Sequence, residues 1–218
     1  MPGTWTALAN QPAFNTSTMI LLTDGRVMIQ EEGTAHWHAL TPNGSGSYVD
    51  GQWSTLRDMT FWRRYYASAV TKSGKMFVCG GEQSGDAKNS NKGEIYDPVA
   101  DKWSPIAVPP WSQVGDAVSC VLPDGRIIIG ALLSGDCLIY NPSTGLWATT
   151  GAQSGRTNEQ TWILLPDNTI LAPQCFAPFR SEKYIISLGT WRDDGQLPVN
   201  IVDPVMNEIG PGNVALQW

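Results

Sequence analysis

The stretch that decides the fold of this chain is GDAVSCVLPDGRIIIG, residues 115–130. Apolar and β-branched residues flank Asp124-Gly125 on both sides. Such a pattern is typical of a β-hairpin, because both turn residues can adopt positive φ. The same pattern recurs three more times, at residues 19–29, 69–78 and 162–171. A hairpin that occurs four times in one chain predicts a repeat architecture.

The spacing of the tryptophans indicates the kind of repeat. Five of the ten tryptophans recur 48, 50, 44 and 44 residues apart: Trp5, Trp53, Trp103, Trp147 and Trp191. This period is typical of β-propellers whose blades have four strands. We therefore expect an all-β propeller. In each blade, strand a precedes the Asp-Gly turn, strand b follows it, strand c ends near a Tyr-Asp-Pro type of turn, and strand d carries the tryptophan.

The second repeat is the most complete and resembles a known family. It contains Gly80-Gly81 after strand b, Tyr96 in strand c and Trp103 in strand d. This combination resembles the kelch repeat, and the Leu-Pro-Asp-Gly turns resemble those of galactose-oxidase-like kelch proteins. The resemblance implies a kelch-type β-propeller over essentially the whole chain, although the double glycine is intact only in this repeat.

The repeats divide the chain of 218 residues into blades of a single expected domain. Four complete blades are expected at about 15–56, 65–106, 115–149 and 158–192, with a partial fifth at 207–218 that strand 4–8 completes as strand d. The fifth copy stops before its turn, which leaves three arrangements open: part of a larger ring, a ring of five blades, or two chains paired by their open edges. The family's usual six or seven blades favour the first.

Composition and charge exclude several classes of partner. Fourteen basic and twenty acidic residues give a net charge of −6, with no basic cluster beyond Arg63-Arg64. Neither nucleic acid nor a membrane is therefore an expected partner. The first residues lack the pattern of a signal peptide, and no apolar run is long enough to span a bilayer. The four cysteines without a C-x-x-C pair predict buried free thiols and favour the cytoplasm. The sequons at Asn15 and Asn43 leave secretion open.

The long connections predict which face of the disc carries function. Loops between strands b and c and between strands d and a meet on one face, here called the long-loop face, and long loops on a rigid scaffold often bind ligands. Eight residues before each a–b turn, at the start of strand a, the sequence places Thr16, Tyr65, Asp116 and Glu159. Arg64 precedes Tyr65, and Glu208 stands near the matching place before the fifth strand a.

These residues are expected to ring the mouth of the central channel. Tyr65, Asp116 and Glu159 would then carry protons in acid–base chemistry, with Arg64 stabilising an anion or enolate. The alternative is structural, in which the acids accept backbone hydrogen bonds from adjacent blades and hold the ring together.

Two further sets of residues are candidate ligand sites. His36 and His38 are two apart on one strand, as a chelating pair requires, but a packing pair is favoured and no metal is expected. Trp111, in a long loop, either stacks on a flat ligand such as a sugar or anchors the loop.

The resemblance to galactose oxidases also implies a specific test. Their copper is held by two tyrosines and two histidines, with one tyrosine linked to a cysteine and covered by a tryptophan. Tyr65 falls on the linked tyrosine, but Thr16 stands in the place of the cysteine and Gln83 in that of the tryptophan. A thioether cannot form without the thiol, so copper-radical chemistry is rejected and no cofactor is expected.

Two functions stay open from the sequence. The first is a propeller that binds a small molecule, a carbohydrate or a protein on the long-loop face, with Arg64, Gln83, Trp111 and Glu208 as candidate contacts. The second is a cofactor-independent lyase, isomerase or cyclase that acts on a small, partly apolar molecule at the channel mouth. Self-association through open propeller edges is a further expectation.

Overall fold

The computed structural model describes residues 3–197, 205–210 and 213–217, the last two segments as backbone only. These residues form strands and no helix, so none of them could make a membrane-spanning helix. Sixteen strands make four antiparallel sheets of four strands, each in chain order. Blade one contains β1 (Thr16–Leu21), β2 (Val27–Glu31), β3 (Trp37–Thr41) and β4 (Gln52–Leu56). Blade two contains β5 (Ala67–Val70), β6 (Met76–Cys79), β7 (Gly93–Asp97) and β8 (Lys102–Pro105).

The second half of the chain repeats the same order. Blade three contains β9 (Ser119–Val121), β10 (Ile127–Gly130), β11 (Cys137–Asn141) and β12 (Leu146–Thr149). Blade four contains β13 (Ile163–Leu164), β14 (Thr169–Pro173), β15 (Arg180–Ile185) and β16 (Thr190–Gln196). A hairpin of β17 (Val205–Gly210) and β18 (Asn213–Gln217) follows.

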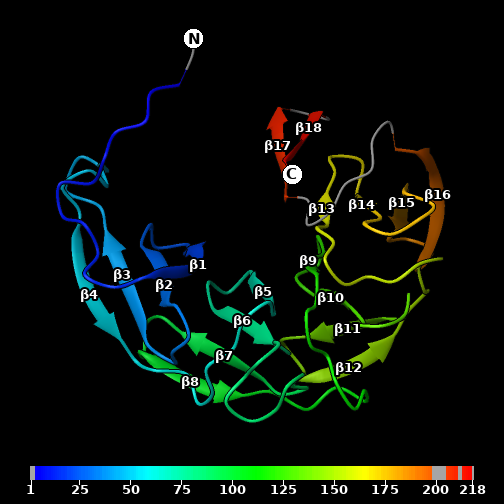
Figure 1. The fold of residues 1–218 in the computed structure, drawn as a ribbon, viewed down its shortest axis with the longest axis horizontal. Helices are drawn as coiled ribbons and strands as arrows, with labels where there is room; N and C mark the ends of the chain where they lie inside the picture. The colour runs from blue at the N-terminus through cyan, green and yellow to red at the C-terminus, as the bar shows by residue number, and fades with distance from the viewer. Residues whose placement is uncertain (1–2, 198–204, 211–212, 218) are drawn as a thin grey trace.

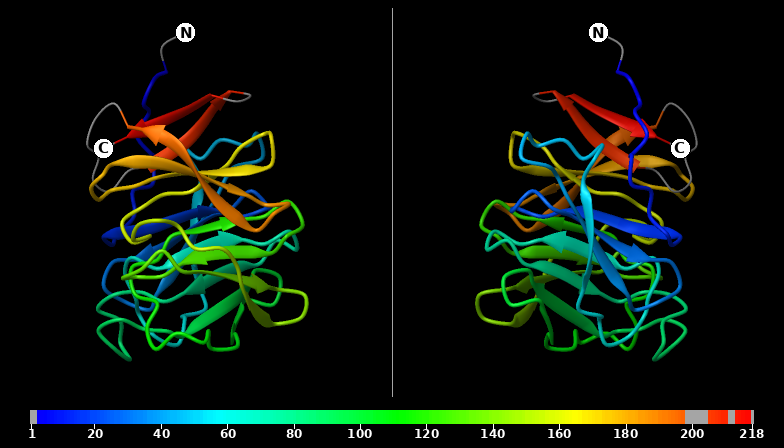
Figure 2. Two further views of the ribbon diagram at one scale, coloured as in Figure 1. Left: turned by 90° about the vertical axis from the view of Figure 1, so that its right-hand side faces the viewer. Right: turned by 90° about the vertical axis from the view of Figure 1, so that its left-hand side faces the viewer.

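The blades are arranged around a centre, as a propeller requires. Strands β1, β5, β9 and β13 lie innermost and β4, β8, β12 and β16 outermost (Figure 1). Among the described residues the blades form an arc that is open between β1 and the β17–β18 hairpin (Figure 1). Seen edge-on, the disc gathers the connections between strands on its two faces (Figure 2). The predicted propeller of four-stranded blades is confirmed.

The a–b turns have the predicted hairpin geometry in all four blades. In blade three, Leu122 N–H donates to the Arg126 carbonyl and Gly125 N–H donates to the Leu122 carbonyl, both at 2.8 Å. The same pair of bonds closes the other three turns, after Leu22, Thr71 and Leu165. The strand that follows the turn in blade three consists of Ile127, Ile128, Ile129 and Gly130, all buried, because each central strand is covered on both faces by neighbouring blades.

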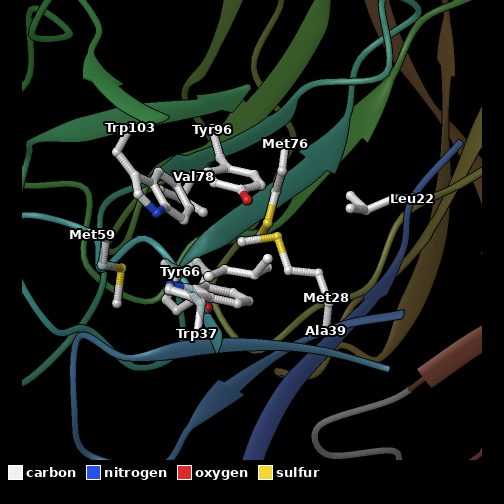
Figure 3. Packing of buried hydrophobic residues seen from close by; sticks show 11 residues of the cluster. Leu22, Met28, Trp37, Ala39, Met59, Tyr66, Met76, Val78, Tyr96 and Trp103 are labelled. Carbon is white, nitrogen blue, oxygen red and sulfur yellow. The ribbon is translucent and has the colours of Figure 1, made fainter. Parts of the chain in front are cut away.

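The hydrophobic core lies between consecutive blades. Figure 3 shows the cluster between blades one and two, where Trp37 and Met28 meet Met76, Tyr96 and Trp103. Two similar clusters join blades two and three and blades three and four. A blade on its own would expose apolar side chains to water on both faces. Each blade therefore depends on its neighbours to bury these side chains.

In blades one to three, the recurring tryptophan ties the blade to the chain segment that leads into it, whereas the indole N–H of Trp191 in blade four has no hydrogen-bond partner among the described residues. In blade two, the ring centroid of Trp103 lies 5.1 Å from that of Tyr96, and its indole N–H donates to the Arg57 carbonyl at 2.8 Å. Trp53 and Trp147 donate in the same way to the Asn10 and Ala107 carbonyls. Each of these bonds joins the outermost strand of a blade to the backbone just before that blade.

The expected strand at Thr4–Leu8 is wrong. These residues form no strand, and Trp5 is fully exposed. A strand d needs a strand c beside it, and no described strand offers its edge to this segment. The chain instead crosses the outer face of blade one, where the Phe14 ring stacks on His38 with 3.8 Å between centroids.

The end of the chain, where a partial fifth blade is expected at 207–218, contains a pair of strands among its described residues. Two antiparallel strands, β17 and β18, occupy this part of the chain, with Glu208 opposite Val214. In the sequence, Gly210-Pro211-Gly212 joins the two strand segments. Glycine and proline are poor in strand interiors and common in turns, which accounts for two short strands.

Gly80 is the first of the two adjacent glycines that follow β6 in blade two. A substitution there tests why this position of the repeat is a glycine. Gly80 adopts φ 82°, and a Cβ atom would lie 2.5 Å from Val114 Cγ1 of the linker to blade three. Gly25 adopts φ 85° with nothing within 4 Å of such a Cβ. Gly25→Ala should therefore lower the free energy of unfolding by about 1–2 kcal/mol through backbone strain alone. Gly80→Ala should lower the free energy of unfolding by about 1–3 kcal/mol more than Gly25→Ala does, because the added methyl group overpacks against Val114.

Urea unfolding of both variants, followed by tryptophan fluorescence, checks this difference. Equal losses for the two variants would show that close packing against Val114 does not matter.

Candidate functional site

The residues predicted at the start of strand a lie at the approach to the innermost strands of blades two to four. Tyr65 is 61% exposed, whereas Asp116 and Glu159 are half-buried. Backbone contacts join blades two and three here, because Ala117 N–H donates to the Tyr65 carbonyl at 3.3 Å. The Glu159 carbonyl accepts a bond from Cys175 Sγ. The structure thus brings Tyr65 beside the Asp116 segment, and a catalytic role for these side chains stays a prediction.

Several of the predicted site residues have an unusual backbone conformation. Six described residues other than glycine have positive φ, and three of them were sequence candidates: Tyr65 at 51°, Gln83 at 46° and Glu159 at 58°. Non-glycine residues in this region cost free energy and cluster at functional sites. The observation draws attention to the long-loop face, where all three lie.

The Arg64 side chain contacts Glu32 of blade one and the Trp62 ring, not the other members of the predicted strand-a set. Its Nη2 lies 3.5 Å from Glu32 Oε1 of blade one, and its guanidinium carbon lies 6.0 Å from the centre of the Trp62 ring. Exposed Gln83 lies in the β6–β7 loop. The Glu208 side chain lies outside the described residues.

The two histidines contact different acids. His36 Nδ1 lies 3.0 Å from Asp58 Oδ1, and this hydrogen bond raises the pKa of His36. His38 Nε2 lies 3.3 Å from Glu31 Oε2, and its ring stacks on Phe14. In the part of the chain that the structure describes, no group of three or more His, Cys, Asp or Glu side chains could hold a metal ion.

The long-loop face is hollowed where a d–a linker meets the b–c loop of the next blade. The blade-three seam, between residues 110–113 and 131–136, is a hollow of about 460 Å³ whose lining includes Trp111, Leu133 and Asp136. The blade-four seam, between residues 155–156 and 174–177, is a hollow of about 410 Å³. Its lining is Gly155, Arg156, Gln174, Phe176 and Ala177.

The matching place in blade two is filled. Gly85 N–H donates to the Trp62 carbonyl at 2.9 Å, and a Cβ at Gly85 would lie 2.9 Å from Trp62 Cδ1. The tryptophan therefore packs directly against the b–c loop. Sequence reasoning found Trp111 but missed Leu133, Arg156 and Phe176, although two successive leucines in a loop, Leu132 and Leu133, were a usable signal.

Two buried carboxylates beneath this face were also missed. Glu94 and Glu182, which are 3% and 5% exposed, each stand two residues before the tyrosine of strand c. Glu94 accepts bonds from Thr60 N–H and Oγ1 and lies 3.4 Å from Arg63 Nη2. The recurrence of Glu-x-Tyr in the sequence was the signal that could have found them.

Three of the four cysteines are buried thiols, as the sequence predicted, and Cys120 is half-buried. All four are free, and burial raises the pKa of Cys79, Cys120 and Cys137 to about 12. Thiolate is the reactive form of cysteine, so these groups are poor nucleophiles at neutral pH.

Comparisons with known proteins agree with this architecture. A family model described as the kelch motif matches residues 63–107. Human Kelch-like protein 23 is 31% identical over 149 residues, which cover 66% of this chain and 23% of that protein. An F-box/kelch-repeat protein of Arabidopsis thaliana is 29% identical over 104 residues, covering 45% of this chain and 26% of that protein. The chain thus spans about a quarter of the length of these curated relatives.

A solved structure extends the likeness beyond the matched repeat. The structure of YjhT superposes with a TM-score of 0.72 at 15% identity, covering 92% of this chain and 72% of that one. The matched segment 63–107 contains Gly80-Gly81, Tyr96 and Trp103, the residues on which the resemblance was based. The chain is a β-propeller of four-stranded blades whose second blade matches the kelch motif.

The raised pKa values of the thiols predict slow alkylation of these cysteines in the native chain. With a pKa of about 12, Cys79 should be about 10⁻⁴ ionised at pH 8, against about a quarter for an ordinary thiol. Iodoacetamide at pH 8 should therefore label Cys79, Cys120 and Cys137 far more slowly in the native chain than in urea. Peptide mapping by mass spectrometry measures this, and native labelling of Cys79 at the unfolded rate would contradict it.

Proposed function

We propose that this propeller is a recognition module that binds a protein partner on its long-loop face, through the blade-three seam. The observation that carries the proposal is an exposed leucine in a hollow. Leu133 is 62% exposed and lines the seam together with half-buried Trp111 and exposed Pro110. An apolar side chain that stays in water in a hollow lined by both apolar and polar groups favours a partner that covers it.

The seam is held in shape by contacts that a binding surface needs. Trp111 packs against the cluster between blades two and three, and its carbonyl accepts a bond from Asn91 Nδ2 at 2.9 Å. At the rim, Ser134 Oγ donates to Asp136 at 2.8 Å, and Asn89 Nδ2 donates to Gln113 Oε1 at 3.3 Å. An apolar centre with an ordered polar rim is the usual anatomy of a protein interface.

The family likeness supports a protein as the ligand, since kelch proteins commonly bind protein partners. A carbohydrate or small molecule in the same seam would use Trp111 as a stacking surface. The enzymatic alternative rests on Tyr65, Asp116 and Glu159 and stays a prediction.

Leu133→Asp should abolish this binding surface, because it places a charge where an apolar side chain must be covered. Peptides selected from a displayed random library on the native chain are the probe, and their affinity should fall at least about tenfold, or about 1.4 kcal/mol, on the variant. Leu188→Asp is the matched control. Leu188 is 58% exposed but lies in the β15–β16 turn on the opposite face.

Equal binding of the selected peptides to native chain and Leu133→Asp would overturn the proposal. A glycan array provides the second arm. Sugars that bind the native chain and are lost on Trp111→Ala, with no peptide binding at the seam, would favour a carbohydrate ligand.

A further inference from the structure

The same buried glutamate has a different electrostatic environment in blades two and four. In blade two, Glu94 faces Arg63, which is fully buried. Arg63 Nη1 donates to the Gly80 carbonyl at 2.7 Å and to the Lys92 carbonyl at 2.9 Å. The carboxylate therefore has a fixed positive partner, as buried charges normally do.

In blade four that partner is missing. Thr157 stands two residues before Glu159, as Arg63 stands two residues before Tyr65, so threonine occupies the register of the arginine. Glu182 accepts bonds from Ser154 N–H at 3.3 Å and from Gln174 Nε2 at 2.7 Å. Both donors are neutral. Within residues 3–197, Glu182 makes no ion pair with a lysine, arginine or histidine.

Gln174 connects this carboxylate to the blade-four seam. Its Nε2 donates to Glu182 and, at 3.0 Å, to Ser154 Oγ, so both amide hydrogens are used. Gln174 also lines the hollow, and its Oε1 atom has no hydrogen-bond partner in the described chain. The hollow thus includes a residue with an unused acceptor oxygen that is backed by a buried negative charge, a combination that attracts a cation.

The opposite side of the hollow already accommodates a guanidinium. The Arg156 guanidinium carbon lies 5.6 Å from the centre of the Phe176 ring, within the range of a cation–π interaction. Arg156 is exposed and can move away, whereas Phe176 is half-buried. Gln153, next to Ser154, is 5% exposed, and neither atom of its side-chain amide has a hydrogen-bond partner among the described residues. Gln153 does not line the hollow, so the unused acceptor that a ligand in the hollow could reach is Gln174 Oε1.

We propose that the blade-four seam is a binding site for a guanidinium group from outside the chain. The incoming group displaces Arg156 from the face of Phe176, donates to Gln174 Oε1, and is attracted by the charge of Glu182. The site goes beyond the proposed function, because it lies in a different seam and is tested without any protein partner. Failure at this site would leave the Leu133 experiment unaffected.

The first experiment measures binding of small guanidinium compounds to the full chain. Nα-acetyl-arginine amide and agmatine are titrated, and the Gly155 backbone amide and the Gln174 side-chain amide are followed by NMR. We expect dissociation constants in the millimolar range. Nα-acetyl-citrulline amide, which is neutral and similar in shape, should bind at least about tenfold more weakly. Tighter binding of the arginine amide would indicate an arginine of a polypeptide as the source, and tighter binding of agmatine a free compound.

Variants then separate this proposal from its alternatives. Arg156→Gln should bind the arginine amide about threefold more tightly, because the internal competitor for Phe176 is gone. Glu182→Gln should bind at least about tenfold more weakly, whereas Asp167→Asn, an exposed acid on the opposite face, should not change the affinity. If Glu182→Gln does not fold, Phe176→Leu replaces it and should bind about threefold more weakly.

Three results would overturn the proposal. Citrulline amide could bind as tightly as arginine amide, which would show that charge is not recognised. Loss of binding in Arg156→Gln would make Arg156 itself the receptor. An unchanged affinity in both Glu182→Gln and Phe176→Leu would place the ligand elsewhere.

Discussion

The structure depends on one repeated interaction, in which the strand-d tryptophan joins the outer edge of a blade to the backbone that enters it. The indole of Trp103 packs on Tyr96 and donates its only N–H to the Arg57 carbonyl. Trp53 and Trp147 repeat the bond. Because Arg57 directly follows β4, this contact fixes where one blade ends and the next begins. The apolar faces of adjacent blades are thereby held in register for burial.

The two faces of the disc differ because one is formed partly by the uniform a–b turns and the other by the d–a linkers and b–c loops, which differ between blades. The a–b turns are tight and nearly identical, since each has the same two backbone bonds. The linkers and b–c loops share no such common pattern, and bonds between them, such as Gly85 N–H to the Trp62 carbonyl and Gln153 N–H to the Gly135 carbonyl, differ from blade to blade. Trp62 fills this space in blade two, whereas Leu133 and Phe176 leave hollows in blades three and four. One scaffold thus presents a different surface at each blade.

Features of the fold that depend on local sequence patterns could be predicted from the sequence. The Asp-Gly turns and the tryptophan period predicted a propeller with blades of four strands, because both signals lie within a single repeat. The strand at Thr4–Leu8 was wrong because strand formation there requires a partner from another part of the chain. The seams could not be predicted for a similar reason, since each hollow results from two loops about twenty residues apart and from the volumes of their side chains. Tyr65, Asp116 and Glu159 shortly precede β5, β9 and β13, but the exposure of Tyr65 depends on its neighbours in space.

The comparison of Glu94 with Glu182 shows how a repeat can separate stability from recognition. A buried ion pair such as Glu94–Arg63 adds little net stability over an apolar pair, yet loss of one partner leaves an unpaired charge that costs several kcal/mol. The buried Glu94 of blade two therefore requires Arg63 as its partner. In blade four the Gln174 amide and Ser154 N–H satisfy the hydrogen bonds of Glu182 without neutralising its charge. The fold tolerates this carboxylate without an internal cation, and its negative charge lies beside a hollow that opens to solvent.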